Sequence, residues 1–458
     1  MAWDIETDVV VVGGGGCGLM AAGTAATVEG GVDVVLLEKD SDDPCTSVIT
    51  SSFIPAAGTR LQRAAGIEDS PEIMAGDILK KNGHKSDQDI TLELCRRSAE
   101  TIHWFIDGLG VDIEFAPEVT WFGHTNSRMH SHPTRIGVPI IGQMRSYFTS
   151  RDNTDYHDKT PGSGLVVDEA GAVIGVTAER NGSEIRIGAK KVVLTTGGFN
   201  ANRDMLAQYI PEMAEAPTIG AKTNTGEGIL WGMEAGAAVD QMTGYQGRDC
   251  IFEDGTRLTP GVINEGGIAV NKTGKRFVNE EQDYSQLAAV YRAQPDSFAV
   301  FIWDERIQHM TENMHVMKES MRKGGIEIRD TVAEIAEHFN LPADVLQETV
   351  ASYNNGVQAG RDALERKKLT EPLTAPFYAS RITGAMGHTQ GGLKVDTSCR
   401  VLRPDGSPIP NLYAGGNTMV GLSGDTAGGY MSGNGLLVAY TTGLIIGQEA
   451  VAAIRSGN

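Results

Sequence analysis

Residues 8–18 read Asp-Val-Val-Val-Val-Gly-Gly-Gly-Gly-Cys-Gly, a run of β-branched residues that ends in a cluster of glycines. The small residues of 19–26 favour a helix, and residues 32–37, Val-Asp-Val-Val-Leu-Leu, predict a second buried strand. A strand, a tight turn, a helix and a second strand in this order form a β-α-β unit. The sequence therefore predicts an α/β fold around a parallel sheet.

The glycines of this turn have the spacing of a dinucleotide-binding loop, Gly13-x-Gly15-x-x-Gly18, and Glu38 ends the second strand. Such glycines allow a tight turn and bring the backbone close to a pyrophosphate, which the N–H groups at the helix start bind. Glu38 can accept hydrogen bonds from the ribose hydroxyls, and its charge disfavours the 2′-phosphate of NADP. FAD and NAD both remain open on these residues alone.

Composition argues against several other classes of protein. Among the 458 residues, 39 Lys and Arg face 59 Asp and Glu, and a net charge of −20 does not suit a nucleic-acid or anionic-membrane surface. The N-terminus lacks the basic and apolar regions of a secretory signal, so we expect a cytoplasmic protein. Residues 436–454 are apolar but interrupted by Thr and Gln-Glu, which predicts a buried helix and no membrane span. Five cysteines without a C-x-x-C pair are expected to be reduced packing residues: Cys17, Cys45, Cys95, Cys250 and Cys399.

Further segments carry a family resemblance, in chain order. They are TSSFIPAAG (50–58), VLTTGGF (193–199), TGEG (225–228), NKTGKRFVNE (271–280), GGLKVD (391–396) and IPNLYAGGN (409–417). Together with the N-terminal turn, they resemble the flavoprotein family that includes soluble fumarate reductases, succinate dehydrogenase flavoprotein subunits and 3-ketosteroid dehydrogenases. The resemblance covers nearly the whole chain and implies FAD as the cofactor.

The resemblance also implies a domain organisation. We expect a Rossmann-like FAD-binding domain of the GR2 type, with a parallel sheet and a β-meander, in 1–235 and 371–458. An inserted α+β capping domain that carries part of the substrate site is expected in 236–370. Alternation and turn residues predict antiparallel hairpins over 164–191, and helical patterns cover 331–339 and 343–359.

The cofactor is expected to be FAD held without a covalent bond, because residues 47–52 contain no His where flavinylated members of the family carry one. No second GxGxxG follows a strand, so a separate NAD(P)H site is not expected. The apolar C-terminal helix is expected to direct its N-terminus at the N1/O2 edge of the flavin. The residues expected to bind FAD are Gly13, Gly15, Gly16, Gly18, Glu38, Lys39, Thr50, Ser51, Ser52, Ala57, Gly58, Thr196, Gly197, Gly198, Asn224, Gly228, Gly416, Asn417, Asn434, Gly435 and Leu436.

The expected catalytic residues follow from two departures from the fumarate reductases. In those enzymes an Arg four residues after the Glu of the GKRF-x-NE motif shuttles a proton, and an Arg in the C-terminal Gly-rich segment clamps a substrate carboxylate. Tyr284 and Tyr430 stand at these positions here, as tyrosines do in the 3-ketosteroid dehydrogenases. His388 matches the substrate-binding His that precedes a Gly-Gly turn in the reductases.

Two phenols suit the desaturation of a ketone. A neutral phenol donates to a carbonyl oxygen and a phenolate accepts a proton, whereas a dicarboxylate needs the permanent charges of the missing arginines. Tyr284 is predicted to take the α-proton while Tyr430, with the N–H of Gly433 or Asn434, binds the carbonyl, and the β-hydrogen leaves as hydride to flavin N5. His388 is expected to hydrogen-bond the carbonyl or a carboxylate.

The predicted function is an FAD-dependent desaturase of a small cyclic ketone: a cyclohexanone-type ring, a ring keto acid or a steroid. A fumarate-reductase-like ene reductase acting on an unsaturated carboxylate is the alternative, because the same site works in both directions. A flavin-binding protein without turnover is a third hypothesis. Oxygen, a quinone or an electron-transfer protein would accept the electrons.

Residues 121–135 are expected to form a loop near the flavin. Arg128 or Arg135 would be available there to a substrate carboxylate. No metal is expected, because no acid or Cys completes a site with the histidines of this loop, His124, His130 and His132. Tyr291, seven residues after Tyr284, is a second-choice phenol if the stretch is helical.

Overall fold

The structure, a computed structural model, describes residues 2–457 and contains two compact units. The first comprises Met1–Ile210, Gly220–Tyr245 and His388–Asn458, and the second comprises Pro211–Ile219 and Gln246–Gly387. These bounds differ from the expected boundaries at 235 and 370. One reason is that β15 (Phe377–Thr389) pairs with the sheet of the second unit from Phe377 to Ile382. The assignment of one unit to FAD binding and the other to capping remains a prediction.

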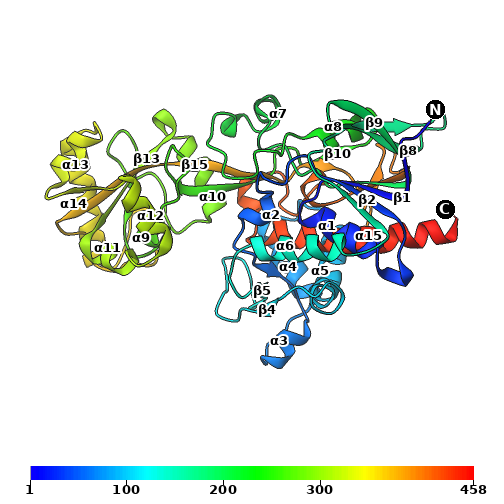
Figure 1. The fold of residues 1–458 in the computed structure, drawn as a ribbon. Helices are drawn as coiled ribbons and strands as arrows, with labels where there is room; N and C mark the ends of the chain where they lie inside the picture. Colours follow the sequence, from blue (N-terminus) through cyan, green and yellow to red (C-terminus); the bar gives the residue numbers. More distant parts are fainter. Residues whose placement is uncertain (1, 458) are drawn as a thin grey trace. The chain divides into compact units, whose positions relative to one another are not determined.

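The first unit is built on a sheet of which Figure 1 labels β1, β2, β8 and β9. The strand order of this sheet is β17-β18-β9-β1-β2-β6, with β17 at Arg400–Leu402. Its parallel part consists of β1 (Ile5–Val12), β2 (Val34–Leu37), β6 (Thr154–His157), β9 (Ser183–Leu194) and β18 (Pro408–Ala414). Val10 of β1 lies opposite Val35 on one side and Val192 on the other. A strand that pairs on both sides inside a parallel sheet is buried on both faces, so its sequence is a continuous run of apolar residues. The predicted α/β fold with a parallel sheet is confirmed.

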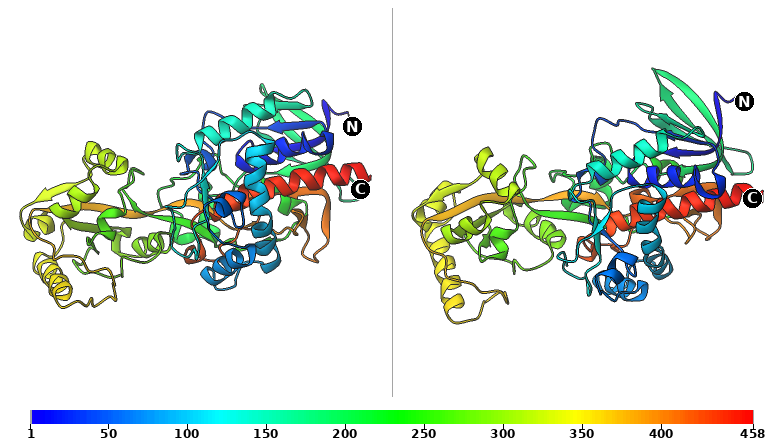
Figure 2. Two further views of the ribbon diagram at one scale, coloured as in Figure 1. Left: turned by 90° about the horizontal axis from the view of Figure 1, so that it is seen from below. Right: turned by 60° about the horizontal axis from the view of Figure 1, so that its bottom comes forward.

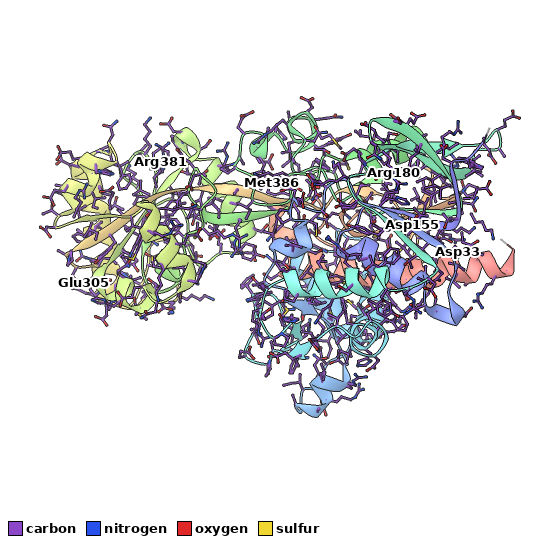
Figure 3. All side chains as sticks on the ribbon, viewed as in Figure 1. Asp33, Asp155, Arg180, Glu305, Arg381 and Met386 are labelled. Carbon is purple, nitrogen blue, oxygen red and sulfur yellow. The ribbon has the colours of Figure 1, made fainter. Side chains whose placement is uncertain are left out.

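An antiparallel meander extends this sheet. β7 (Gly162–Val167) pairs with β8 (Val173–Arg180), which pairs with β9, as the predicted hairpins require. Asn181 and Gly182 join β8 to β9 with φ of 53° and 77°, the left-handed backbone that a tight hairpin needs. At the opposite edge, the exposed Asp155 on β6 (Figure 3) places a charge where another strand would otherwise pair.

Helices α1 (Gly16–Ala25) and α15 (Asn434–Ser456) lie side by side in the first unit (Figures 1 and 2). Their contact is close because small residues face each other: a Cβ on Gly443 would lie 2.6 Å from the Cys17 carbonyl oxygen. By length and composition α15 is apolar enough to cross a membrane, a weak criterion that a core helix also meets. In this helix, 72% of the most apolar window is buried inside the protein.

The remaining elements of the first unit include β17 at the edge of this sheet, together with helices and short strands outside it. They are η1 (Val28–Gly30), α2 (Thr46–Ile49), β3 (Ile54–Pro55), α3 (Arg60–Ala64), α4 (Pro71–Lys81), α5 (Gln88–His103), η2 (Trp104–Gly108), β4 (Glu114–Phe115), β5 (Met129–Ser131), α6 (Val138–Thr149), α7 (Arg203–Tyr209), α8 (Glu227–Glu234), β10 (Val239–Asp240), β16 (Gly392–Leu393), β17 (Arg400–Leu402), η5 (Gly416–Thr418) and η6 (Ala427–Gly429).

The second unit has its own five-stranded sheet and core. The strand order is β11-β15-β13-β12, with β14 also paired to β15. The central strand β13 (Ala299–Asp304) is buried along its whole length. The predicted helices are confirmed as α13 (Val332–His338), with a capping box from Thr331, and α14 (Ala343–Gln358). The remaining elements are η3 (Pro211–Met213), β11 (Tyr245–Ile251), α9 (Gly261–Asn264), β12 (Ile268–Val270), α10 (Tyr284–Arg292), η4 (Pro295–Ser297), α11 (Glu305–Thr311), α12 (His315–Lys323) and β14 (Glu327–Arg329).

Candidate functional site

The glycine turn between β1 and α1 has no room for side chains at Gly13 and Gly18. A Cβ on Gly13, whose φ is 109°, would lie 2.4 Å from the Thr195 carbonyl oxygen, and one on Gly18 would lie 1.8 Å from the Gly13 carbonyl oxygen. Gly15 is the N-cap of α1, and no side chain of residues 2–457 caps this helix. Its first N–H groups therefore need acceptors from elsewhere, which a phosphate supplies.

Glu38 lies beside this turn at the end of β2. Its Oε2 accepts the Gly14 N–H at 2.8 Å and its Oε1 accepts the Asp40 N–H at 2.8 Å. A carboxylate accepts about four hydrogen bonds, so lone pairs remain for ribose hydroxyls. Lys39 turns its ammonium to Glu227, with an N–O distance of 2.5 Å. A cofactor contact by Lys39 would therefore use its backbone.

The loop after α2 is shaped by its own hydroxyl groups. Thr50 donates to the Ser47 carbonyl oxygen at 2.9 Å and accepts the Ser52 N–H at 3.2 Å. Ser52 has a φ of 56°, and its Oγ lies 2.6 Å from Ser131 Oγ. Ser51 is exposed, so of these three residues it offers its side chain most freely.

Farther along this loop, Ala57 and Gly58 are set by backbone geometry. The Ala57 N–H donates to Ser98 Oγ at 3.1 Å, so this donor is already used inside the protein. Gly58 has a φ of 76°, which a glycine adopts without strain.

A second group of predicted cofactor-binding residues follows β9. A Cβ on Gly197 would lie 2.4 Å from Asn224 Oδ1, and one on Gly198 would lie 2.1 Å from Thr389 Oγ1. The Gly228 N–H donates to Thr196 Oγ1 at 3.2 Å. These contacts bring residues 196–198 together in space with Asn224 and Gly228, all of them predicted to bind the cofactor.

The start of α15 holds a buried amide without a partner. Gly433, the N-cap, has a φ of 92°, and a Cβ there would lie 2.8 Å from Pro55 Cδ. Asn434 is 0% exposed, and neither its Oδ1 nor its Nδ2 has a hydrogen-bond partner in the part of the chain that the structure describes. Leaving such a group unpaired costs about 1–3 kcal/mol, so the site fits a ligand with a polar edge.

His388 and Tyr430 meet over the second residue of this helix. A Cβ on Gly435 would lie 3.0 Å from His388 Nε2 and 3.6 Å from the Tyr430 hydroxyl. The two rings are edge to face, with centroids 5.5 Å apart. Burial lowers the pKa of His388 to about 4, so its imidazole is neutral at pH 7. The phenol and the neutral imidazole therefore approach the same small space.

Gly416, Asn417 and Leu436 border this region. The Gly416 N–H donates to Thr442 Oγ1 at 3.0 Å, and Leu436 is buried. Asn417 directs its amide to His388 Nδ1 at 2.9 Å. Asn417, which is predicted to bind the cofactor, therefore also contacts a residue predicted to bind the substrate. This contact was not expected from the sequence.

Tyr284 belongs to the second unit, at the first position of α10. Asp283 caps this helix by accepting the Ser285 N–H at 2.9 Å. Gln246 Nε2 lies 3.5 Å from the Tyr284 hydroxyl, and the Arg248 guanidinium lies 4.7 Å from the ring centroid. Gln246 and Arg248 were missed by sequence reasoning, although their alternate positions on one strand place them on one face.

Two sequence expectations are corrected by burial and pairing. Tyr291 is fully buried in the core of the second unit between Phe277 and Phe301, so it is a packing residue and not a second-choice phenol. Arg128 is 0% exposed and pairs with Asp69 at 3.0 Å and Asp77 at 2.7 Å. Its charge is already used within the protein and is not available to a substrate carboxylate.

Arg135, His130 and His132 of the 121–135 segment have internal partners as well. Arg135 pairs with Glu114 at 2.9 Å and with Glu118 at 3.1 Å. His130 Nε2 lies 2.9 Å from Thr59 Oγ1, and His132 Nδ1 lies 2.7 Å from Thr134 Oγ1.

His124 connects this segment to the loop before α15. Its Nε2 donates to the Ser432 carbonyl oxygen at 2.9 Å. Within the described residues, no group of three or more His, Cys, Asp or Glu is arranged to hold a metal.

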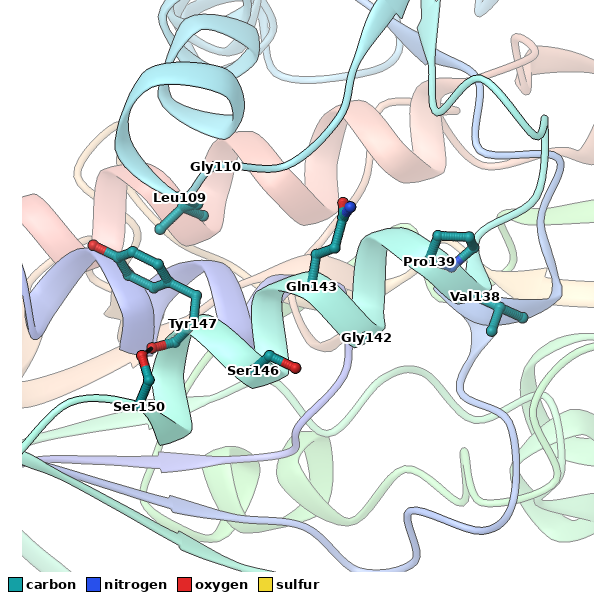
Figure 4. A pocket seen from close by; sticks show the side chains of 9 residues that line it. All are labelled: Leu109, Gly110, Val138, Pro139, Gly142, Gln143, Ser146, Tyr147 and Ser150. Carbon is teal, nitrogen blue, oxygen red and sulfur yellow. Dashed lines mark hydrogen bonds between the residues drawn. The ribbon is translucent and has the colours of Figure 1, made fainter.

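A shallow surface depression lies along α6 (Figure 4). None of the predicted site residues lines it, and its lining carries no charge. It consists of Leu109, Gly110, Val138, Pro139, Gly142, Gln143, Ser146, Tyr147 and Ser150.

The first unit therefore has the parts that a flavin dinucleotide needs. The turn 13–18 would hold the pyrophosphate, Glu38 the ribose, and the start of α15, with the unpaired Asn434, the polar edge of the ring system. These parts fit FAD, and the roles of the other predicted cofactor-binding residues remain predictions.

Comparisons with known proteins agree with this fit. Residues 8–436 match the FAD binding domain family. The urocanate reductase of Eggerthella lenta is 31% identical over 427 residues, which are 90% of this chain and 69% of that protein. The open conformation of a flavocytochrome c3 fumarate reductase gives a TM-score of 0.85 at 27% identity, covering 98% of this chain and 79% of that chain. The 3-ketosteroid-Δ4-(5α)-dehydrogenase of Rhodococcus jostii RHA1 gives a TM-score of 0.78 at 26% identity, covering 98% of both chains.

Proposed function

The chain belongs to the FAD binding domain family and is an FAD-dependent oxidoreductase of the class that acts on carbon–carbon bonds, and on this premise we propose that it desaturates a cyclic ketone. When bound, FAD supplies the hydride acceptor for this chemistry. The product is the α,β-unsaturated ketone. The electrons would pass to oxygen, a quinone or an electron-transfer protein, and the FAD is held without a covalent bond.

One observation carries this proposal: the Tyr430 hydroxyl and the neutral His388 approach the same space at the N-terminus of α15. Donors fixed where negative charge develops stabilise an enolate-like transition state. A neutral ketone oxygen matches neutral donors, whereas a carboxylate is bound best by a guanidinium. Tyr430 therefore binds the ketone oxygen, and His388 assists it.

Tyr284 removes the α-proton in this proposal. The amide of Gln246 near its oxygen and the guanidinium of Arg248 over its ring both favour a negative charge on the phenol. A phenol that is stabilised as phenolate accepts a proton, whereas Tyr430 acts as a donor. The two tyrosines thus divide the acid and base work.

A second candidate is an ene reductase that acts on an unsaturated carboxylate. Arg248 favours it, because among residues 2–457 no carboxylate lies within ion-pair distance of its half-buried guanidinium. The relatives named as urocanate and fumarate reductases support the same direction. Arg248 could then take the role of a carboxylate-binding arginine.

Anaerobic mixing of the FAD-loaded protein with substrates separates the two candidates. Cyclic ketones should bleach the flavin, and fumarate should reoxidise the reduced protein slowly. Tyr284→Phe should slow bleaching by about 10²–10⁴-fold through loss of the base, and Tyr430→Phe by about 10²–10³-fold through loss of an oxyanion donor. Tyr147→Phe, which removes a hydroxyl bound to Thr27 at 2.9 Å, is the matched control. Rapid reoxidation by fumarate together with full activity of Tyr284→Phe would mean that the protein is an ene reductase and not a ketone desaturase.

A further inference from the structure

His388 is surrounded by groups that determine which of its ring nitrogens carries the proton. Its Nδ1 lies 2.9 Å from Asn417 Nδ2 and 3.1 Å from Gln390 Nε2, both N–H donors, whereas the Thr389 carbonyl oxygen, which can only accept, lies farther away at 3.4 Å. The two amide donors are the nearer partners, so Nδ1 accepts from them. A ring nitrogen that accepts hydrogen bonds carries no proton, and a neutral imidazole then has its proton on the other nitrogen.

Gln390 has a second hydrogen-bond partner. Its Oε1 accepts the Ser423 hydroxyl at 2.8 Å, which leaves its NH₂ group directed at His388. This contact matters because an amide oxygen and nitrogen are told apart by their hydrogen-bond network. Ser423, Gln390 and His388 are thus joined by a chain of hydrogen bonds.

We propose that Asn417 and Gln390 are positioning residues that hold His388 as the neutral tautomer with its proton on Nε2, so that it presents an uncharged hydrogen-bond donor to the substrate carbonyl. The identity of this ligand rests on the proposed function, whereas the tautomer does not. Nε2 is the nitrogen on the side of Gly435, next to the Tyr430 hydroxyl.

The surroundings of the ring support an uncharged group. Tyr430 is the titratable group that faces it, from the loop before α15, and the other neighbours are the amides of Asn417 and Gln390, the Thr389 carbonyl at 3.4 Å and the backbone of Gly435. The amides and the backbone groups among these neighbours carry no charge. Burial lowers the pKa of His388 to about 4, so the imidazolium is absent over the physiological range.

This arrangement gives the site a preference for ketones. A neutral donor strengthens its hydrogen bond as charge develops on the enolate oxygen, but it offers no full charge to a carboxylate in the ground state. An imidazolium at the same place would favour anions. By keeping His388 neutral, the two amides therefore favour ketone substrates over carboxylates.

Asn417→Asp is the decisive variant, because it keeps the shape of the side chain and exchanges a donor for an acceptor. The new carboxylate accepts a hydrogen bond from Nδ1 only if Nδ1 carries a proton. A neutral His388 in this variant then has no proton on Nε2 and cannot donate to the substrate. The carboxylate also raises the pKa of His388 toward neutrality. Gln390→Glu makes the same exchange from the other side and serves as the second variant where Asn417→Asp fails to fold or to hold FAD.

The tautomer is read by NMR of the FAD-loaded protein labelled with ¹⁵N in histidine, with His388→Gln used to assign the signal. Native His388 should show an unprotonated Nδ1 and a protonated Nε2, unchanged between about pH 5.5 and 8 because its pKa lies below this range. In Asn417→Asp the signal should titrate near neutral pH. Asn355→Asp, which adds the same charge on the exposed side of α14, should leave the spectrum as in the native protein.

The pH profile gives a readout that a merely structural role would not produce. In Asn417→Asp, flavin reduction by a cyclic ketone should fall about tenfold or more at pH 8. It should recover as the pH drops through the new pKa of His388, because the imidazolium again carries a proton on Nε2.

A proton on Nδ1 in the native protein would overturn the inference, as would unchanged His388 signals in both variants. The expected tautomer with no response of Nε2 or of the flavin to any ketone would support the inference and refute the proposed function.

Discussion

Gly435→Ala adds one methyl group where Tyr430 and His388 meet. The new Cβ would lie 3.0 Å from His388 Cε1 and Nε2 and 3.6 Å from the Tyr430 hydroxyl. A contact of 3.0 Å is shorter than the usual carbon–nitrogen separation, so the imidazole has to move by a few tenths of an ångström. It cannot move freely, because Asn417 and Gln390 hold its other side.

The size of the effect follows from this crowding. One extra methyl group in a packed site costs about 1–3 kcal/mol, and a Gly→Ala exchange in a helix gains up to about 1 kcal/mol from propensity. A 1 Å misplacement of a reacting group costs about 10²-fold in rate, so a shift of tenths of an ångström should slow flavin reduction about tenfold.

Gly142→Ala on α6 is the matched control, because it is also helical and nothing lies within 4 Å of the added Cβ. Urea unfolding of the FAD-loaded variants should make Gly435→Ala less stable than Gly142→Ala by about 1–3 kcal/mol. Stopped-flow bleaching by a cyclic ketone should be slowed only in Gly435→Ala. Equal stability and equal rates of the two variants would refute the crowded arrangement of His388 and Tyr430 over Gly435.

Three further perturbations test other parts of the structure. Gly18→Ala, whose Cβ would lie 1.8 Å from the Gly13 carbonyl oxygen, should purify without FAD, whereas Gly76→Ala on α4, with open space around the added Cβ, should keep its full flavin absorbance. Arg128→Met leaves the buried Asp69 without its cation and should lower the free energy of unfolding in urea by about 3–5 kcal/mol; a loss under about 1 kcal/mol would mean that the pair is not buried. Burial lowers the pKa of His130 from 6.5 to about 4, so the unfolded chain binds the extra proton in this window and stability is lost as the pH falls from 6.5 toward 4. The slope contributed by this group is up to about 1.4 kcal/mol per pH unit, and a His130→Gln variant with the native slope would contradict it.

The sequence by itself determined the fold class, the FAD-binding turn and the class of chemistry. Gly18 excludes a side chain because an added Cβ would lie 1.8 Å from the carbonyl oxygen of Gly13, five residues earlier, and Gly13 has a φ of 109°, which favours glycine. The β-branched run before them is apolar because its strand is paired on both sides. The glycine spacing and the apolar run each lie within a few consecutive residues, so the sequence alone predicts the turn and the strand. The family motifs in 50–58 and 409–417 are also visible in the sequence, and they identified FAD as the cofactor.

Only the tertiary structure decided which polar groups already have partners within the protein. Arg128 looked available in the sequence, but its carboxylate partners Asp69 and Asp77 are supplied by segments more than fifty residues away in the chain. Tyr291 shares a helix with Tyr284, yet packing against Phe277 and Phe301 buries it. The state of His388 depends on Asn417, which is 29 residues away. Ion pairs, burial and tautomers are set by such long-range contacts, because the free energy of a charge or a proton depends on what the folded chain places beside it.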